Sequence, residues 1–359
     1  MKKSLIALAV VSTLVAPVAM AETSNVNVYG QVNLSLDMVK SGGTNGATAN
    51  QVSSNESRLG FKGSEDLGGG VSAIFQIERG IAADGSSDTL SSRNTFGGLK
   101  SDVGGSLVLG IHDTPYKIAT RRLDVFNGTI ADNRGIMGGD YHDMRFQDSI
   151  NYMSPSWGGF SVAAAYGLGA EGTTSSTQSK GKGISVAGMY EMGPIYVAAA
   201  HQKITDGSAG TGTFGGTPGD SDKAMKVGVG YKMDMFAVNA VLENLKGISG
   251  GVSDKTRNLY VAGQFNITAS DAIKVAVTQQ KDWDMGGVTQ PNTGSRQLSI
   301  GYDHNLSNRT TVYALWSKIS NKQNVNNALQ GQSSSVGSSL STTAGADPSA
   351  ISIGLKHWF

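Results

Sequence analysis

The chain has 359 residues, of which 29 are basic and 28 acidic, and this near balance gives no indication of a nucleic-acid partner. It contains no cysteine, so a disulfide framework, a thiolate metal site and a cysteine nucleophile are excluded. Glycine is abundant at 49 residues, charged residues make up only 16%, and no stretch after residue 21 reaches the roughly 18 apolar residues of a transmembrane helix.

The first 21 residues have the features of a secretory signal peptide. Lys2 and Lys3 give a positive start, residues 5–16 form a short apolar core, and residues 19–21 (Ala-Met-Ala) have the small-x-small pattern of a cleavage site. The apolar core is too short to span a membrane as a helix, so we expect cleavage rather than an N-terminal anchor. Removal of Lys2 and Lys3 changes the charge balance to 27 basic against 28 acidic residues.

Residues 26–38 alternate strictly between apolar and polar side chains. The even positions hold Val26, Val28, Gly30, Val32, Leu34, Leu36 and Met38, and the odd positions hold Asn27, Tyr29, Gln31, Asn33, Ser35 and Asp37. Such a period of two predicts a β-strand with one apolar and one polar face. The run is longer than a usual soluble strand and matches the length that a tilted membrane-spanning strand needs.

Similar segments recur along the chain and predict fifteen further strands. They lie near 56–63, 71–79, 93–100, 106–111, 145–153, 159–167, 183–190, 195–203, 223–232, 236–246, 257–266, 272–282, 295–304, 309–319 and 350–359. The connectors between them alternate in length. Seven are short and eight are long, and the long ones lie near 39–55, 80–92, 112–144, 168–182, 204–222, 247–256, 283–294 and 320–349.

This sorting of connectors predicts an outer-membrane barrel, in which short turns face the periplasm and long loops face outward. A soluble sandwich has no reason to sort its loops in this way. Because an open sheet edge would leave unpaired backbone groups in hydrocarbon, the sheet must close. We therefore expect an all-β fold over residues 22–359, a 16-stranded antiparallel transmembrane β-barrel, with its polar faces toward a water-filled interior.

The polar stretch 320–349 has the composition of an interdomain linker, but a clear strand follows it, so we interpret it as a surface loop. In that strand Ile351, Ile353, Leu355, His357 and Phe359 share one face, and Ser352, Gly354, Lys356 and Trp358 share the other. An aromatic residue at the end of the last strand resembles the signal that outer-membrane assembly machinery reads, which makes Phe359 the candidate assembly signal.

Several segments resemble the trimeric general diffusion porins of beta-proteobacteria and Neisseria. The most specific is SRLGFKGSEDLG at residues 57–68, followed by the strand AIFQIE at 73–78. NVYGQVNLSLD at 27–37, SPSWGGFSVAAAY at 154–166, NLSNRTTVYALW at 305–316 and the terminal Phe359 also match. One departure is Ile111, which stands where the family usually has an arginine after the glycine of the fifth strand.

The resemblance implies a homotrimer of 16-stranded barrels, each narrowed by a third loop that folds inward. It also implies passive passage of ions and small hydrophilic solutes, an anion preference in several relatives, and partners that include outer-membrane lipid, lipopolysaccharide and the barrel assembly machinery. No cofactor is implied.

In such a channel, the functional site is the constriction, where selectivity depends on pore width and on nearby charged side chains. The connector 112–144 falls where the inward loop of the family lies. It carries the acids Asp113, Asp124, Asp132, Asp140 and Asp143 and the bases Lys117, Arg121, Arg122 and Arg134. Such mixed charge suits a polar rim, although an ordinary solvated surface loop has a similar composition.

On the wall, alternation places Glu56, Arg58 and Lys62 on the interior face of one strand. By resemblance, Arg58, Arg93 and Arg145 match the arginines that face the inward loop of the family. Arginine suits this role because its charge does not titrate and its fork can hold a carboxylate or phosphate. Two interpretations remain open: these side chains select anions, or they pair with neighbouring acids to hold the loop.

Two other functions are weaker. A substrate-specific channel for small anionic metabolites needs an aromatic track or a dense ladder of basic residues, and neither is clear in the sequence. A barrel enzyme needs a catalytic pair at a strand rim, for which His142 beside Asp143 and Asp140 is the candidate. The five histidines have no metal-binding spacing, and GLGAEG at 167–172 has no following helix pattern, so we expect no metal and no cofactor.

Overall fold

A computed structural model describes residues 25–43, 46–87, 90–138, 142–169, 181–207, 214, 219–249, 252–331 and 342–359. Across these residues the chain forms nineteen strands and two short helices. The strands are β1 Asn25–Lys40, β2 Thr48–Ser54, β3 Arg58–Gly68, β4 Val71–Gly80, β5 Ser91–Ser101, β6 Gly105–Asp113, β7 Arg145–Met153, β8 Phe160–Gly167, β9 Lys182–Met192, β10 Ile195–Thr205, β11 Ser221–Lys232, β12 Phe236–Ser249, β13 Val252–Asn266, β14 Asp271–Gln280, β15 Asp284–Met285, β16 Val288–Thr289, β17 Ser295–Ser307, β18 Thr310–Asn321 and β19 Ser349–Trp358. The helices are α1 Pro115–Arg121 and the 3-10 turn η1 Asn133–Gly135.

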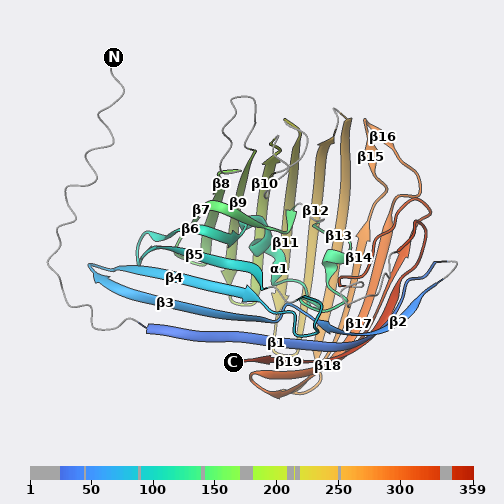
Figure 1. The fold of residues 1–359 in the computed structure, drawn as a ribbon, viewed down its shortest axis with the longest axis horizontal. Helices are drawn as coiled ribbons and strands as arrows, with labels where there is room; N and C mark the ends of the chain where they lie inside the picture. The colour runs from blue at the N-terminus through green and yellow to red at the C-terminus, as the bar shows by residue number, and fades with distance from the viewer. Residues whose placement is uncertain are drawn as a thin grey trace.

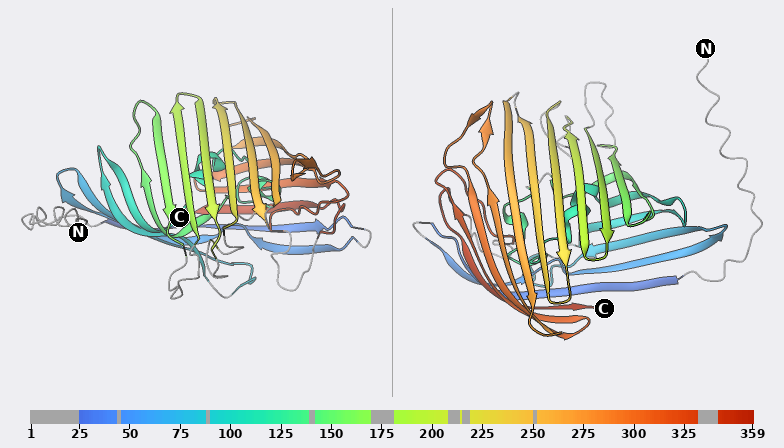
Figure 2. Two further views of the ribbon diagram at one scale, coloured as in Figure 1. Left: turned by 90° about the horizontal axis from the view of Figure 1, so that it is seen from above. Right: turned by 180° about the vertical axis from the view of Figure 1, so that it is seen from behind.

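The strands form one antiparallel sheet that closes on itself, because β1 pairs with β19 on one side and with β2 and β3 on the other (Figures 1 and 2). Within the described chain, β2 and β3 are two parts of one barrel strand, since both pair with β1 in succession. The two-residue strands β15 and β16 form a hairpin that extends a loop. Sixteen strands therefore make the barrel, as predicted.

The burial of side chains is the reverse of that in a soluble protein. On β1, Asp37 is 0% exposed and points inward, whereas its neighbour Leu36 is 54% exposed and points outward. Exposed Met225, Leu242 and Leu259 repeat this pattern on β11, β12 and β13. Water would strongly disfavour so much exposed apolar surface, so the outer face suits hydrocarbon and the polar face suits a wet interior.

Three features depart from the pattern predicted by alternation and connector length. The stretch 247–256, predicted as a long connector, is mostly strand, because β12 runs to Ser249 and β13 begins at Val252. The second barrel strand begins at Thr48, inside the stretch predicted as connector 39–55, and it is interrupted at Glu56. Glu56 has a φ of 59°, a left-handed conformation that breaks the ladder and that alternation alone does not predict. The β15–β16 hairpin lies within the predicted connector 283–294 and is too short to produce an alternating pattern.

The barrel closes where the end of β19 meets β1. Gly30 donates a backbone hydrogen bond of 3.0 Å to the Phe359 carbonyl, and the Phe359 amide donates one of 3.2 Å to the Gly30 carbonyl. A Cβ at Gly30 would lie 2.4 Å from the Phe359 ring, so glycine is needed for this close approach.

Neither helix in the described part of the chain is long and apolar enough to cross a membrane.

Candidate functional site

The connector between β6 and β7 lies on the inner side of the sheet, as α1 does in Figure 1. Thr114 caps α1 by accepting a hydrogen bond from the Lys117 amide, and Pro115 occupies the first turn, where no amide donor is needed. The loop buries the apolar side chains Tyr116, Ala119, Leu123, Phe126, Ile130 and Ile136. This burial gives the loop a hydrophobic reason to pack against the wall instead of extending into solvent.

Hydrogen bonds between the loop and strands β10, β12 and β17 hold one side of the loop against the barrel wall. Tyr116 donates a hydrogen bond of 2.6 Å to Glu243 on β12, and Tyr196 on β10 donates one of 2.8 Å to the Ala119 carbonyl. Gln297 on β17 donates one of 3.0 Å to the Ala131 carbonyl. These partners come from strands distant in sequence, so the loop is fixed across a wide part of the barrel interior.

Glycines on the same wall make room for the loop. A Cβ at Gly228 on β11 would lie 2.6 Å from Leu123 and 2.9 Å from Thr120. A Cβ at Gly301 on β17 would lie 2.7 Å from the Phe126 ring. The wall is therefore shaped to receive the loop at these positions.

The opposite side of the loop faces a cavity of about 350 Å³, which we call the charged gap. Its lining residues come from the loop, from the break between β2 and β3, and from β1, β3, β5, β6, β7 and β19. They are Gln31, Glu56, Arg58, Arg93, Asp113, Lys117, Arg121, Asn127, Gly128, Arg145, Lys356 and Trp358. Six of these side chains are cationic and two are acidic.

Buried acids order the cations on the wall. The Glu78 carboxylate on β4 accepts a hydrogen bond of 2.5 Å from Arg93 and one of 3.0 Å from Tyr29, and it lies 3.6 Å from the Arg58 guanidinium. Arginine forks held by a shared carboxylate keep a fixed direction toward the gap. Because Glu78 is itself buried, its charge is largely used within this cluster.

A second acid orders the cations at the start of the loop. Asp113 lies 2.8 Å from the Lys117 ammonium and 3.2 Å from the Arg145 guanidinium. Asn94 also accepts a hydrogen bond of 3.1 Å from Arg145. Three predicted site residues, Asp113, Lys117 and Arg145, are thus in direct contact.

The acids Asp124 and Asp132 lie inside the loop rather than on the charged gap. Asp132 is 0% exposed and forms ion pairs with Arg121 and Arg134. Although burial acts in the opposite direction, these two guanidinium groups hold the pKa of Asp132 well below its usual range. Burial and the nearby Asp132 carboxylate raise the pKa of Asp124 to about 6.

Two further predicted residues lie away from the charged gap. Lys62 faces the interior, but its ammonium sits 5.0 Å from the centre of the Tyr29 ring and lines a separate cavity with Asn25 and Asn27. Arg122 makes a two-pronged pair with Glu191, at 2.6 and 2.7 Å, on the other side of the loop. Asp140 lies outside the described residues.

The family model described as Gram-negative porin matches residues 6–324 of this chain. The chain is a Gram-negative porin.

Curated relatives agree with this assignment. Outer membrane porin protein 32 of Delftia acidovorans is 27% identical over 381 residues, covering 100% of both chains. Major outer membrane protein P.IB of Neisseria gonorrhoeae is 30% identical over 176 residues, covering 46% of this chain and 48% of that protein. The porin is therefore an outer-membrane channel protein, in agreement with the predicted family.

Solved structures agree on the fold. The anion-selective porin from Comamonas acidovorans has a TM-score of 0.79 at 24% identity, covering 94% of this chain and 100% of that one. Outer-membrane expressed OmpT of Vibrio cholerae has a TM-score of 0.70 at 14% identity, covering 94% and 98%. The barrel of this porin is thus shared by structures with little sequence in common.

Sequence reasoning did not single out Lys356 and Trp358, although both line the charged gap of the porin. The sequence did indicate an interior location for both residues, because alternation along the last strand places them on the face opposite Phe359. In the structure Lys356 pairs in register with Asn33, and Trp358 with Gln31, two interior residues of β1. The gap is therefore completed by the strand that closes the barrel.

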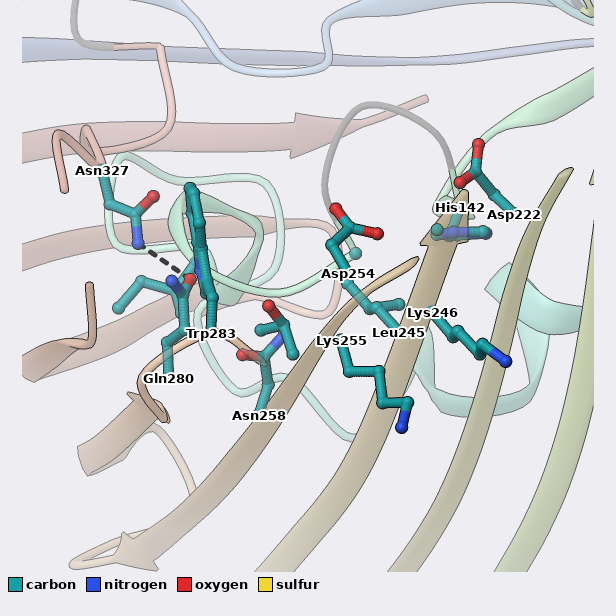
Figure 3. A pocket seen from close by; sticks show the side chains of 14 residues that line it. His142, Asp222, Leu245, Lys246, Asp254, Lys255, Asn258, Gln280, Trp283 and Asn327 are labelled. Carbon is teal, nitrogen blue, oxygen red and sulfur yellow. Dashed lines mark hydrogen bonds between the residues drawn. The ribbon is translucent and has the colours of Figure 1, made fainter. Parts of the chain in front are cut away.

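The His142 and Asp143 pair does not have the geometry of a catalytic dyad in the described chain. The Asp143 carboxylate accepts a hydrogen bond of 2.6 Å from Lys226 on β11. His142 is buried and lines a cavity of about 280 Å³, which is also lined by Trp283, Asp222 and Asp254 (Figure 3). Burial lowers the pKa of His142 to about 4, so the ring is neutral at neutral pH.

Proposed function

We propose that this porin is a water-filled channel for passive diffusion of ions and small hydrophilic solutes, with a mild preference for anions. The observation that carries the preference is the lining of the charged gap, where six cationic side chains face two acidic ones. An anion entering the gap meets an excess of positive charge at contact distance, whereas a cation meets an unfavourable potential.

Charges at such close quarters act more strongly than the same charges on an open surface. The Debye length is about 10 Å at 0.1 M salt, so ions in a cavity of this size lie within the unscreened range of the wall. Four of the six cations of the gap are arginines, and the guanidinium group is a permanent charge in proteins. The similar structure from Comamonas acidovorans, an anion-selective porin, supports the same assignment.

The predicted constriction residues divide into two roles in this proposal. Arg58, Arg93, Lys117, Arg121 and Arg145, joined by Lys356, set the potential of the gap. Arg121, Arg134, Asp124 and Asp132 shape the loop that narrows the channel, and Arg122 ties the far side of that loop to the wall. Lys62 acts on ions farther along the interior, beyond the gap.

The remaining features concern export and assembly. We infer that residues 1–21 are a cleaved signal peptide and that residues 22–359 make the barrel, which assembles as a homotrimer. A trimer form of Vibrio cholerae OmpT, whose chain has a TM-score of 0.66 to this one, supports the trimer by likeness of fold. Phe359 would serve the assembly machinery, and lipid with lipopolysaccharide would surround the barrel.

The sign of the reversal potential tests the proposed preference. Refolded porin inserted into a planar bilayer, with a tenfold KCl gradient across it, is expected to give an ohmic current whose reversal potential lies toward the chloride equilibrium potential. A reversal potential on the potassium side would reject the preference. Absence of any current from correctly folded protein would reject the channel itself.

A further inference from the structure

Four lysines lie side by side across four neighbouring strands of the barrel. Lys203 on β10 is in register with Lys223 on β11, Lys223 with Lys246 on β12, and Lys246 with Lys255 on β13. Adjacent strands are about 4.8 Å apart, so each ammonium group has another within reach of its flexible stem. We call these four residues the lysine row.

The lysine row points away from the barrel interior. Two residues along from Lys223 on the same face, Met225 is 55% exposed, while the intervening Ala224 is fully buried. On β12, Lys246 likewise shares its face with exposed Leu242 and not with buried Glu243. In Figure 3 the Lys246 and Lys255 side chains extend away from the carboxylates of Asp222 and Asp254, although all four residues belong to the lining of the cavity of about 280 Å³.

Like charges placed directly opposite each other on neighbouring strands destabilise a sheet. Three consecutive lysine pairs therefore need nearby negative charge, from the protein or from a bound ligand, to offset their repulsion. Within the described residues, none of the four ammonium groups has an ion-pair partner. The nearest acid in register is Asp284, opposite Lys255 on the β15 hairpin, and its carboxylate already accepts a hydrogen bond from Gly287. Asp284 thus supplies a negative charge opposite Lys255, whereas Lys203, Lys223 and Lys246 have no acid in register within the described strands.

The lysine row also has a definite position along the barrel axis, relative to the apolar band. Four residues farther along the same faces, Val227, Leu242 and Leu259 form part of the exposed apolar band. On the other side of the row, β10 runs into the long connector that precedes β11, and β12 and β13 pair at the same end of the barrel as far as Ser249 and Val252. Because long loops of such barrels face outward, the row stands at the boundary between the apolar band and the outer surface, where lipid headgroups lie.

Other basic residues extend the positive surface at this level. Arg257 lies two residues from Lys255 on the outer face of β13, and Lys281 follows the end of β14. Arg296 on β17 is exposed in register with Gln279. A band of this kind on one sector of the outer wall is suited to a ligand that carries several phosphates and remains in the plane of the membrane.

We propose that the lysine row binds the phosphate groups of lipopolysaccharide, the phosphorylated glycolipid of the outer leaflet. Each lysine contributes a charge-assisted hydrogen bond to a phosphate oxygen, and the acyl chains lie along the apolar band below it. This inference rests on the proposed outward orientation of the long loops. It does not depend on the ion preference of the channel.

The test compares two triple variants of the full porin with the same change in charge. The row variant carries Lys223→Gln, Lys246→Gln and Lys255→Gln. The matched control carries Lys100→Gln, Lys232→Gln and Arg309→Gln, three exposed residues next to the short turns at the other end of the barrel. Both are refolded in detergent, and binding of lipopolysaccharide, dephosphorylated lipopolysaccharide and phosphatidylglycerol is measured at fixed ionic strength without divalent cations.

For lipopolysaccharide we expect the row variant to bind on the order of a hundredfold more weakly than the wild type, about fivefold for each lysine. The control should bind as the wild type does, and dephosphorylated lipopolysaccharide should bind weakly to all three proteins. Equal losses in both variants, or no loss in the row variant, would overturn the proposal. Phosphatidylglycerol bound by the wild type as tightly as lipopolysaccharide would overturn the assignment of the partner.

Single-channel conductance of the same proteins separates this inference from the proposed function. All three should conduct alike, because the lysine row lies outside the channel. The row variant could conduct normally and still bind lipopolysaccharide as the wild type does. That result would refute the inference and leave the channel function intact.

Discussion

The Glu56 carboxylate on the barrel wall accepts a hydrogen bond of 2.6 Å from Arg134 on the inward loop, 78 residues later in the chain. The same carboxylate lies 3.5 Å from Arg121. Because Glu56 is one of the two acids that line the charged gap, this contact links the position of the loop to the potential of the channel.

Neutralising that acid should strengthen the anion preference. In Glu56→Gln the gap keeps its six cations and loses one of two acids, so the chloride-to-potassium permeability ratio should rise by about two- to threefold at low salt and less at high salt. The ratio comes from reversal potentials in a KCl gradient. Glu191→Gln is the matched control, since Glu191 also pairs with an arginine but lies away from the gap. Equal shifts in both variants would contradict a local effect.

Reversing a wall cation should act in the other direction. Arg58→Glu removes one positive charge from the gap and adds a negative one beside buried Glu78. We expect selectivity to shift toward cations by roughly tenfold in the permeability ratio, with normal barrel assembly, because the side chain faces water and not the apolar band. The heat-sensitive migration of the folded barrel on a gel measures assembly. An unchanged reversal potential would remove Arg58 from the selective group.

The hydrogen bond between Tyr116 and Glu243 should hold the loop in place. Tyr116→Phe keeps the ring but leaves a fully buried carboxylate oxygen without its donor, at a cost of about 1–3 kcal/mol. Amide exchange in residues 115–138 should become at least tenfold faster, and open-channel current should become noisier. Tyr190→Phe, whose hydroxyl is on an exposed side chain, should change neither quantity.

The glycine at position 228 should control how far the loop extends into the channel. In Gly228→Val the new side chain would overlap Leu123 and Thr120, so α1 must move away from its wall and toward the charged gap. We expect single-channel conductance to fall, by roughly a third or more as a steric estimate. Gly97→Val is the control, because a Cβ at Gly97 meets nothing within 4 Å. Unchanged conductance in Gly228→Val would show that the loop yields elsewhere.

Two buried groups should give the docked loop opposite responses to pH. The pKa of His142 is lowered from 6.5 to about 4, so its contribution to docking is complete above pH 6.5 and is lost as the pH falls toward 4. The pKa of Asp124 is raised from 3.8 to about 6, so its contribution is complete below pH 3.8 and is lost as the pH rises through 6. In the wild type these contributions oppose each other.

Single variants should separate the two responses. In Asp124→Asn only His142 titrates, and loop fluctuations should increase as the pH falls from about 6.5 to about 4.5. In His142→Gln only Asp124 titrates, and fluctuations should decrease over the same range. Open-channel noise at constant salt measures both. Parallel pH profiles in the two variants would contradict these assignments.

The barrel was predictable because alternation and connector length both follow from the membrane. Segment 145–153 coincides with β7, and each of the other predicted segments overlaps its strand. The break at Glu56 was not predictable, because a single left-handed residue leaves no periodic trace. The β15–β16 hairpin is likewise too short to show a pattern.

The candidate site was only partly predictable. The sequence shows which face a residue of the wall occupies, and on that basis it placed Arg58 in the interior, whereas Arg93 and Arg145 were assigned there by resemblance to the porin family. It does not show which side of the inward loop a residue occupies, so Arg122 and Arg121 look alike in sequence although one pairs with Glu191 and the other lines the gap. That difference depends on the tertiary packing of the loop, and the loop has no periodic sequence pattern from which it could be predicted.

The pairing of Gly30 with Phe359 also constrains how the molecule can fold. β19 follows every other strand of the sheet in the chain, and yet β1 must find it before the edges of the sheet are satisfied. No partial sheet can therefore be sealed against lipid, and the contact that completes the structure spans nearly the longest possible stretch of sequence. Loop-closure entropy opposes such a contact, so spontaneous folding should be slow, and an unsealed intermediate should be vulnerable to aggregation and proteolysis until the seam forms.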